Sequence, residues 1–334
     1  MTSRPDIPVG APPSDAGSDR PPVPELAVDG AVQPFWLRGA PVRGRLVRLG
    51  PLAHAILSRH PGNPPVVNAI LAEALALTAG LAASLKYQGS FSLQARGDGA
   101  VPMLLADCTD AGALRGYARF DADKLATLDE APSAARLLGA GYLAFTCETR
   151  LQGGGPDMDR YQGIVPLEGA SLGEITHTYF RNSEQTETAV RTFARHTDVG
   201  WRAGALIIER VAIEGGLDVP EQEAAEDAWR AAVAFVSTLS ADELLDDALP
   251  AQMLLRRLFF ELAPAFAEPR TLSYGCRCTR SKLAGVLAGF GADDLDHMAE
   301  PDAAMPGAMP GGRITMTCEF CNHAFHFARA SFDL

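Results

Sequence analysis

The 334-residue sequence has only six cysteines, a deficit of basic side chains and no sign of an export signal. Its 29 lysines and arginines are outnumbered by 41 aspartates and glutamates, which gives a net charge of −12 and a pI near 5.0. This balance repels phosphate backbones, so it argues against nucleic acid as a partner. The sequence also contains no phosphate-binding P-loop, and we expect neither ATP hydrolysis nor another enzymatic activity.

The N-terminal segment lacks the apolar stretch of a signal peptide. The sequence MTSRPDIPVGAPPSDAGSDRPPVPEL holds seven of the 24 prolines and shows no helical pattern. We therefore expect residues 1–34 to form a disordered, proline-rich tail. Without an export signal the expected compartment is the reducing cytoplasm, where clustered cysteines indicate metal or redox chemistry before structural disulfides.

One apolar segment, Val66 to Leu85, is long enough to cross a membrane. It contains Glu73 and Asn68, and much of its apolar character comes from alanine and other small residues. A carboxylate in mid-membrane is costly, so the segment favours a buried helix of a soluble domain and no membrane partner.

Residues 35–216 mix strands and helices in an order that does not repeat as strand, helix, strand, which favours an α+β core. Ser171 and Glu174 have the spacing of a capping box and predict a helix that runs toward Arg181. The expected strands are two around the turn Gly97, Asp98, Gly99, followed by GALRGYARF, GYLAFTCETR, YQGIVPLEG, TAVRTFARH and GALIIERVAI.

Residues 217–270 are expected to form a helical linker. Between Asp218 and Arg270 there are 11 acidic and 4 basic residues, with apolar residues at helical spacing. Ser240 and Glu243 predict a second capping box, and Pro250 suits the first turn of a following helix. Short helices gain most of their stability from packing, so the linker depends on a neighbouring surface.

Residues 271–334 contain four of the six cysteines, in two pairs. Cys276 and Cys278 form CxC, and after a 39-residue interval Cys318 and Cys321 form CxxC. Two short loops that each present two thiolates suit a tetrahedral metal, with zinc the natural occupant and iron its main rival. The segment has few apolar residues and needs such a cross-link to fold.

The remaining cysteines and the nearby histidines have ordinary explanations. Four sulfurs complete a zinc site, so we expect His323 and His326 to lie beside the ligands or on the surface. Cys108 and Cys147 fall in expected strands, where isolated cysteines behave as small hydrophobic residues.

The spacing of the two pairs also permits a second bonding state. Cys276 can join Cys278 and Cys318 can join Cys321, and these disulfides exclude a metal bound to the same sulfurs. The positive charges of Arg277 and Arg280 are placed to favour reactive thiolates. Because metal binding stabilises so small a module, oxidation would eject the ion and unfold it, which makes the site a candidate switch.

With these residues in view, the sequence resembles the heat shock protein 33 family of redox-regulated holdase chaperones. The resemblance covers nearly everything after the tail. It is carried by RLVRLGPLAHAILSRH, ILAEALALTAGLAASLKYQG, SFSLQARGDGAVPMLLADC, GALRGYARF, YQGIVPLEGASLGEITHTYFRNSEQ, LLRRLFFE, CRC and CEFCN.

The resemblance implies an α+β core, a helical linker and a small C-terminal zinc domain whose ligands are Cys276, Cys278, Cys318 and Cys321. It implies an inactive reduced form with one bound zinc. Oxidation forms the disulfides Cys276–Cys278 and Cys318–Cys321, releases zinc and frees the linker. The active form, a homodimer, then binds unfolding proteins without ATP. This sequence departs from the family in its long tail and in an insertion, Pro301 to Gly312.

Three other interpretations remain at the level of the sequence. A thiol oxidoreductase would use CxxC at the start of a helix, whereas CEFCNHAFHF indicates a knuckle followed by a strand. A zinc ribbon that binds nucleic acid would be basic, but Thr271 to Leu334 has 5 basic and 7 acidic residues. A purely structural zinc site would show no response to oxidants.

Overall fold

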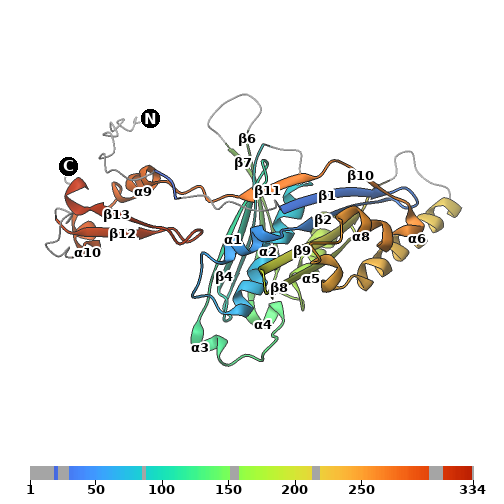
Figure 1. The fold of residues 1–334 in the computed structure, drawn as a ribbon, viewed down its shortest axis with the longest axis horizontal. Helices are drawn as coiled ribbons and strands as arrows, with labels where there is room; N and C mark the ends of the chain where they lie inside the picture. The colour runs from blue at the N-terminus through green and yellow to red at the C-terminus, as the bar shows by residue number, and fades with distance from the viewer. Residues whose placement is uncertain are drawn as a thin grey trace. The chain divides into compact units, whose positions relative to one another are not determined.

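The computed structural model describes residues 19–21, 30–84, 88–150, 158–212, 219–300 and 311–332 (Figure 1). The chain divides into a core unit within Pro24–Cys276 and a terminal unit that combines described parts of Met1–Val23 and Arg277–Leu334. Most of the expected tail, residues 1–18 and 22–29, lies outside the described residues. The first strand begins at Gly30, ahead of the expected start of the core at residue 35.

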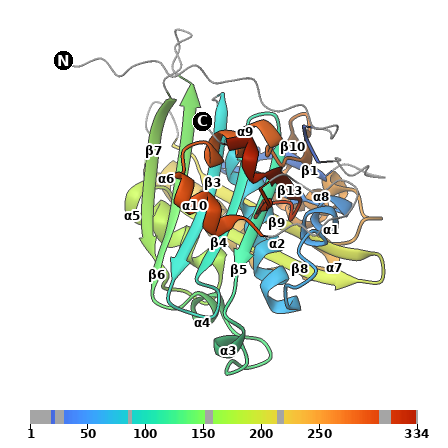
Figure 2. The ribbon, with the colours of Figure 1, turned by 90° about the vertical axis from the view of Figure 1, so that its left-hand side faces the viewer.

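A single large sheet organises the core unit, and the views in Figures 1 and 2 show its long strands side by side. The strand order is β7-β6-β3-β4-β5-β11-β1-β2-β9-β8, with β10 paired to β1, and of these described pairs only β5 and β11 are parallel. This mixed, mainly antiparallel arrangement confirms the α+β class. The strands are β1 (Gly30–Leu37), β2 (Val42–Arg48), β3 (Gly89–Gly97), β4 (Met103–Thr109), β5 (Ala113–Arg119), β6 (Gly141–Arg150), β7 (Met158–Pro166), β8 (Thr188–Thr197), β9 (Gly200–Arg210), β10 (Pro264–Phe266) and β11 (Arg270–Tyr274).

The strands expected from the sequence are all present, and they pair as neighbours in the chain. The turn around Asp98 joins β3 to β4, and GYLAFTCETR corresponds to β6. The expected strand YQGIVPLEG overlaps β7, which begins three residues earlier, at Met158. The glycine-rich connection between β6 and β7 falls largely on residues 151–157, outside the described residues. The core unit also extends past residue 270, because β11 hydrogen-bonds to β1 and β5.

Helix α2 (Pro65–Ala82) is the central helix of the core unit and confirms the expected buried helix, although Leu85 lies outside the described residues. By length and composition it could cross a membrane, but 78% of this stretch is buried inside the structure. The other helices of the core unit are α1 (Pro51–Leu57), α3 (Ala122–Leu125), α4 (Ala134–Leu138), α5 (Leu172–Ser183), α6 (Val219–Thr238), α7 (Ala241–Leu244) and α8 (Ala251–Leu258), with a 3₁₀ turn at Phe260–Leu262.

The two expected capping boxes differ in detail. At the start of α7, Ser240 and Glu243 bond reciprocally, as predicted. At the start of α5, Ser171 accepts from the Glu174 N–H, but the Glu174 carboxylate accepts from Ala170 rather than from Ser171. Pro250 is the N-cap of α8.

The sheet is buried on both faces where β2 and β9 run. Along β9 successive side chains point to opposite faces, so Ala205 and Ile207 join one hydrophobic cluster while Leu206 and Ile208 join another. The first cluster includes residues of α1 and α2, and the second includes residues of α6 and α8. We call the second the linker cluster, because it combines apolar residues of the sheet with those of the linker helices. Packing in this cluster supplies the stability that the linker helices need.

The terminal unit has a much smaller core. It contains a two-stranded sheet, β12 (Arg313–Thr317) and β13 (Ala324–Ala328), with α9 (Arg280–Leu287), α10 (Ala292–Met298) and a 3₁₀ turn at Arg329–Phe332. Its fully buried apolar residues in the described chain are Leu287, Leu295, Ile314, Phe325 and Phe327. So small a cluster cannot offset the entropy of ordering the unit without a further cross-link.

Glu73 generates a prediction for the core unit. It lies on α2, and its carboxylate accepts a hydrogen bond of 2.7 Å from the Thr192 hydroxyl. Burial raises the pKa of Glu73 above its ordinary value of 4.5, an effect that the bond from Thr192 only reduces. The folded chain therefore keeps a proton that the unfolded chain releases, and stability falls as the pH rises from 4.5 through the folded-state pKa.

Glu73→Gln keeps an oxygen that can accept from Thr192 and removes the charge. We expect its Tm to exceed that of the parent by a few degrees at about pH 7.5 and by less at about pH 5, measured by circular dichroism. Glu130→Gln, at an exposed position, is the matched control. A Tm difference that does not change with pH would contradict the prediction.

Candidate metal centre

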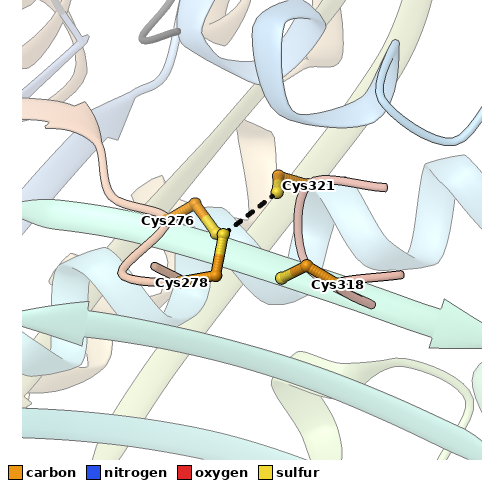
Figure 3. Close-up of side chains that lie close together, drawn as sticks. All are labelled: Cys276, Cys278, Cys318 and Cys321. Atoms are coloured by element: carbon orange, nitrogen blue, oxygen red, sulfur yellow. Dashed lines mark hydrogen bonds between the residues drawn. The ribbon is translucent and has the colours of Figure 1, made fainter. Parts of the chain in front are cut away.

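Four cysteines meet at one point, as the sequence predicted. The sulfur atoms of Cys276, Cys278, Cys318 and Cys321 all lie within 4.8 Å of one another (Figure 3). The Sγ atoms of Cys278 and Cys321 are 3.5 Å apart. Four sulfurs at 2.3 Å from a tetrahedral ion are separated by about 3.8 Å, so the cluster has the size and the donor set of a four-thiolate metal site.

The first pair lies between a strand and a helix. The Gly275 N–H donates to the Leu114 carbonyl at 2.8 Å, which ties the end of β11 to β5 immediately before Cys276. Thr279 directly follows Cys278 and is the N-cap of α9, where its hydroxyl accepts from the Lys282 N–H. The CxC segment is therefore held at both ends by regular structure.

The second pair lies in the tight turn between β12 and β13. The Asn322 N–H donates to the Cys318 carbonyl at 2.7 Å, and the Cys318 N–H donates to the His323 carbonyl at 3.0 Å. Asn322 has a φ of 55°, a left-handed conformation that asparagine adopts more readily than most residues. This turn is the predicted knuckle, and the strand β13 follows it instead of a helix.

Exposure differs between the two pairs. Cys318 and Cys321 are 9% and 3% exposed, whereas Cys276 and Cys278 are half-buried. An oxidant in solution thus has easier access to the CxC sulfurs. The guanidinium of Arg280 donates to the His326 carbonyl at 2.6 Å and lies 4.6 Å from the centre of the Phe327 ring, so it joins the start of α9 to β13.

The two histidines make contacts other than with the sulfur cluster. The His323 ring packs edge-on against Phe325, with ring centres 4.6 Å apart. Nδ1 of His326 lies 3.1 Å from the Thr315 hydroxyl. The described residues that group as metal ligands are the four cysteines.

The two other cysteines lie on strands of the core sheet. Cys108 on β4 is buried, and Cys147 on β6 is half-buried; both are opposite Phe91 in the strand register. Burial and the neighbouring Glu148 raise the pKa of the Cys147 thiol, which keeps it in the unreactive protonated form.

The segment Gly169 to Gly173 reads GASLG and matches the GxSxG pattern of serine hydrolases. In those enzymes the serine occupies a strained turn between a strand and a helix. Here Ser171 has an ordinary extended backbone (φ −138°), and its hydroxyl caps α5. The motif is therefore explained as a helix cap.

The linker helices are held to the sheet by arginines, a feature that reasoning from the sequence missed. Arg48 on β2 donates to two linker carbonyls, those of Leu249 and of Glu243, the latter at 2.9 Å. Burial lowers the pKa of Arg48, and the nearby Asp246 and Asp247 counteract this effect. The signal in the sequence was the acidic excess of the linker, which requires cations on its partner surface.

Further arginines on β8 and β9 pair with acidic linker residues. Arg202, 9% exposed, donates to Asp247 at 2.7 Å, and Arg210 donates to Glu226 at 2.7 Å. Arg195 and Asp242 are 2.6 Å apart but largely exposed, so this pair contributes little.

Beneath these arginines the linker covers apolar residues of the sheet. The sheet side of the linker cluster consists of Phe35, Leu37, Val42, Leu46, Leu206 and Ile208, and the linker side includes Trp229, Val236, Leu244, Leu254, Leu255 and Phe259. Detachment of the linker would expose both sides to water, at a cost of about 25 cal/mol per Å² of apolar surface. A surface of this kind attracts other apolar chains.

The metal site generates a prediction that needs no assumption about function. When cobalt(II) is added to the reduced, metal-stripped full-length protein, we expect one ion to bind with the intense visible absorption of tetrahedral thiolate coordination. Cys321→Ser should weaken this absorption and lower the affinity at least tenfold, because one of four thiolates is lost. Cys108→Ser is the matched control and should bind as the parent does. An octahedral spectrum, or equal effects of both substitutions, would contradict the assignment.

The comparisons with known proteins agree with this arrangement. The Hsp33 protein family model matches residues 30–328. The 33 kDa chaperonin of Caulobacter vibrioides is 37% identical over 305 residues, which cover 89% of this chain and 94% of the relative. The 33 kDa chaperonin of Pseudomonas paraeruginosa is 33% identical over 295 residues, which cover 88% and 90% of the two chains.

A solved structure shows the same fold. The crystal structure of the 33 kDa chaperonin (heat shock protein 33 homolog) from Thermotoga maritima matches with a TM-score of 0.71, covering 92% of this chain and 97% of that chain. At 20% sequence identity this likeness concerns the fold. The family match spans the sheet, the linker and both cysteine pairs, and this chain therefore belongs to the Hsp33 family.

Proposed function

We propose that this chain is a redox-regulated, ATP-independent chaperone, a holdase that binds unfolding proteins under oxidative stress. The observation that carries the proposal is the cluster of four cysteine sulfurs in a part of the chain with very little apolar core. Curated relatives of similar length are named 33 kDa chaperonin. The protein is proposed to act in the cytoplasm, as a homodimer when oxidised, and not as an enzyme.

In the reduced state the four sulfurs are proposed to hold one zinc ion, the usual partner of four cytosolic thiolates. Bound zinc supplies a cross-link between the CxC and CxxC turns and favours the thiolate form of both pairs. The small core of Leu287, Leu295 and the aromatic residues of β13 then suffices to keep the terminal unit folded.

Oxidation is proposed to convert each pair into a disulfide, Cys276 to Cys278 and Cys318 to Cys321. Each pair of thiolates gives two electrons to the oxidant, and one peroxide molecule takes up these electrons together with two protons from the solvent and becomes two water molecules for each disulfide formed. The half-buried CxC pair is the one that we expect to react first. Sulfurs bonded to each other no longer hold the ion, and the unit loses its cross-link.

Residues 217–270 are proposed to be the element that responds. They lead directly through β10 and β11 into Cys276, and their helices are stabilised by packing on the sheet. Loss of order after Cys276 removes a constraint on β11, from which detachment can spread back to α8. The apolar residues of the linker cluster would then be available to an unfolding client.

The regulated activity is tested by light scattering of a client that unfolds on heating. We expect the reduced, zinc-loaded protein to leave aggregation nearly unchanged, and the protein treated with peroxide at elevated temperature to suppress it. Zinc and accessible thiols are counted in the same samples, with loss of one zinc and four thiols expected on activation. Equal suppression of aggregation by both forms would contradict regulation by oxidation. An active form that retains its zinc would indicate a purely structural metal site.

The linker is tested separately by a pair of arginine variants. Arg48→Met leaves two linker carbonyls without their donor, at about 1–3 kcal/mol each if they stay buried. We expect this variant to suppress aggregation in part without any oxidant while it retains zinc. Arg195→Met removes an exposed pair worth about 0.2–1 kcal/mol and should behave like the parent.

The outcome of this comparison decides whether linker docking limits activity. An inactive reduced Arg48→Met variant would argue that the covered sheet face is not the client surface. Activation to the same extent by both variants would point to a general loss of stability, which circular dichroism melts of the two proteins would reveal.

A further inference from the structure

Within the terminal unit, Asp19 contacts the start of α9. The backbone carbonyl of Asp19 accepts from the Arg280 N–H at 2.9 Å, and its carboxylate accepts from the Ser281 N–H at 3.1 Å. The Ser281 hydroxyl lies a further 3.4 Å from the second carboxylate oxygen. Asp19 is 262 residues from Ser281 in sequence and falls within the expected disordered tail.

These bonds complete the N-terminus of α9. A helix begins with backbone N–H groups that have no partner within the helix. In α9 the Lys282 N–H donates to the side-chain hydroxyl of the N-cap Thr279. Leu283 is the first residue whose N–H donates to a backbone carbonyl of the helix, that of Thr279. The two residues between Thr279 and Lys282 are Arg280 and Ser281, and the N–H groups of both donate to Asp19. The negative charge of Asp19 also lies at the positive end of the helix dipole.

The position of this contact links it to the metal centre. Arg280 and Ser281 follow Cys278 by two and three residues, so the helix start that Asp19 completes also fixes the CxC turn. Arg280 in addition bonds to the His326 carbonyl on β13. In a unit with five buried apolar residues, bonds of this kind are a large share of the interactions that maintain the fold.

We propose that Asp19 is a structural clamp on the metal-binding unit, which slows the opening of the CxC turn and so the loss of metal. The partner of the α9 N-terminus is this chain's own N-terminal segment. Such a clamp would also raise the amount of oxidant needed for activation, and this regulatory effect rests on the proposed function. The contact of Asp19 with α9 and its effect on the CxC turn do not depend on chaperone activity.

The clamp is tested by hydrogen–deuterium exchange on the reduced, zinc-loaded, full-length protein. Asp19→Ala removes the carboxylate, and Asp19→Asn keeps an oxygen acceptor but removes the charge. For Asp19→Ala we expect exchange in the first turn of α9 to become about fivefold faster, the factor that corresponds to ~1 kcal/mol for a lost helix cap, with a smaller increase for Asp19→Asn. Asp129→Ala makes the same change at an exposed aspartate of the core unit and serves as the control. Unchanged exchange of the core strands shows that the rest of the fold is intact.

The second readout is the rate at which a chromogenic chelator captures zinc after addition of peroxide. We expect Asp19→Ala to release zinc severalfold faster than the parent and the Asp129→Ala control. Exchange in α9 that matches the parent would overturn the clamp, and faster exchange with unchanged zinc release would overturn its effect on the metal centre. Neither readout depends on chaperone activity, so failure of the clamp and failure of the proposed function are distinguishable.

Discussion

The terminal unit combines a sulfur cluster with a core too small to fold alone, and this imbalance is the constraint on which the protein's behaviour depends. In the described residues the buried apolar set of the unit is five side chains, whereas the first cluster of the core unit continues along the inner face of nearly the whole sheet. Conformational entropy opposes the ordering of every residue to a similar extent in both units. A metal held by the four sulfurs would supply the difference, and under the proposed function the fold of this unit would depend on the chemical state of these sulfurs.

The linker cluster is smaller than the first cluster of the core unit and larger than the cluster of the terminal unit. The apolar residues of the linker are buried against the sheet, and part of its attachment is electrostatic. Helices α7 and α8 are short, as expected, whereas α6 has 20 residues, because its apolar residues continue along the sheet from Trp229 to Val236. Arg48 is a half-buried donor to backbone carbonyls, while Arg195 forms an exposed ion pair that water and salt weaken. The buried apolar clusters therefore become smaller from the central sheet through the linker to the terminal unit. Regions with few buried apolar contacts are the ones that open locally at the lowest cost in free energy.

Local patterns predicted the strands β3 to β9 and several helices, whereas β1, β2, β10 and β11 were not predicted. The alternation in SFSLQARG and LLADC placed β3 and β4, and the Ser240 capping box placed α7, because each depends on residues that are near in sequence. The Glu174 carboxylate bonded instead to Ala170, since a flexible side chain can reach either N–H with similar geometry. The parallel pairing of β11 with β5 was beyond local reasoning, because strands so distant in sequence meet only in the folded sheet.

The sequence by itself determined the chemistry of the candidate site. Two cysteine pairs, each within a few residues, specify soft ligands and their presentation on short turns before any fold is known. Only the tertiary structure decided which arginines hold the linker and that Asp19 completes the start of α9. The physical reason is the separation in sequence of the residues involved. Ligand type and spacing are local properties, whereas a hydrogen bond across 262 residues depends on where the whole chain places its donors and acceptors.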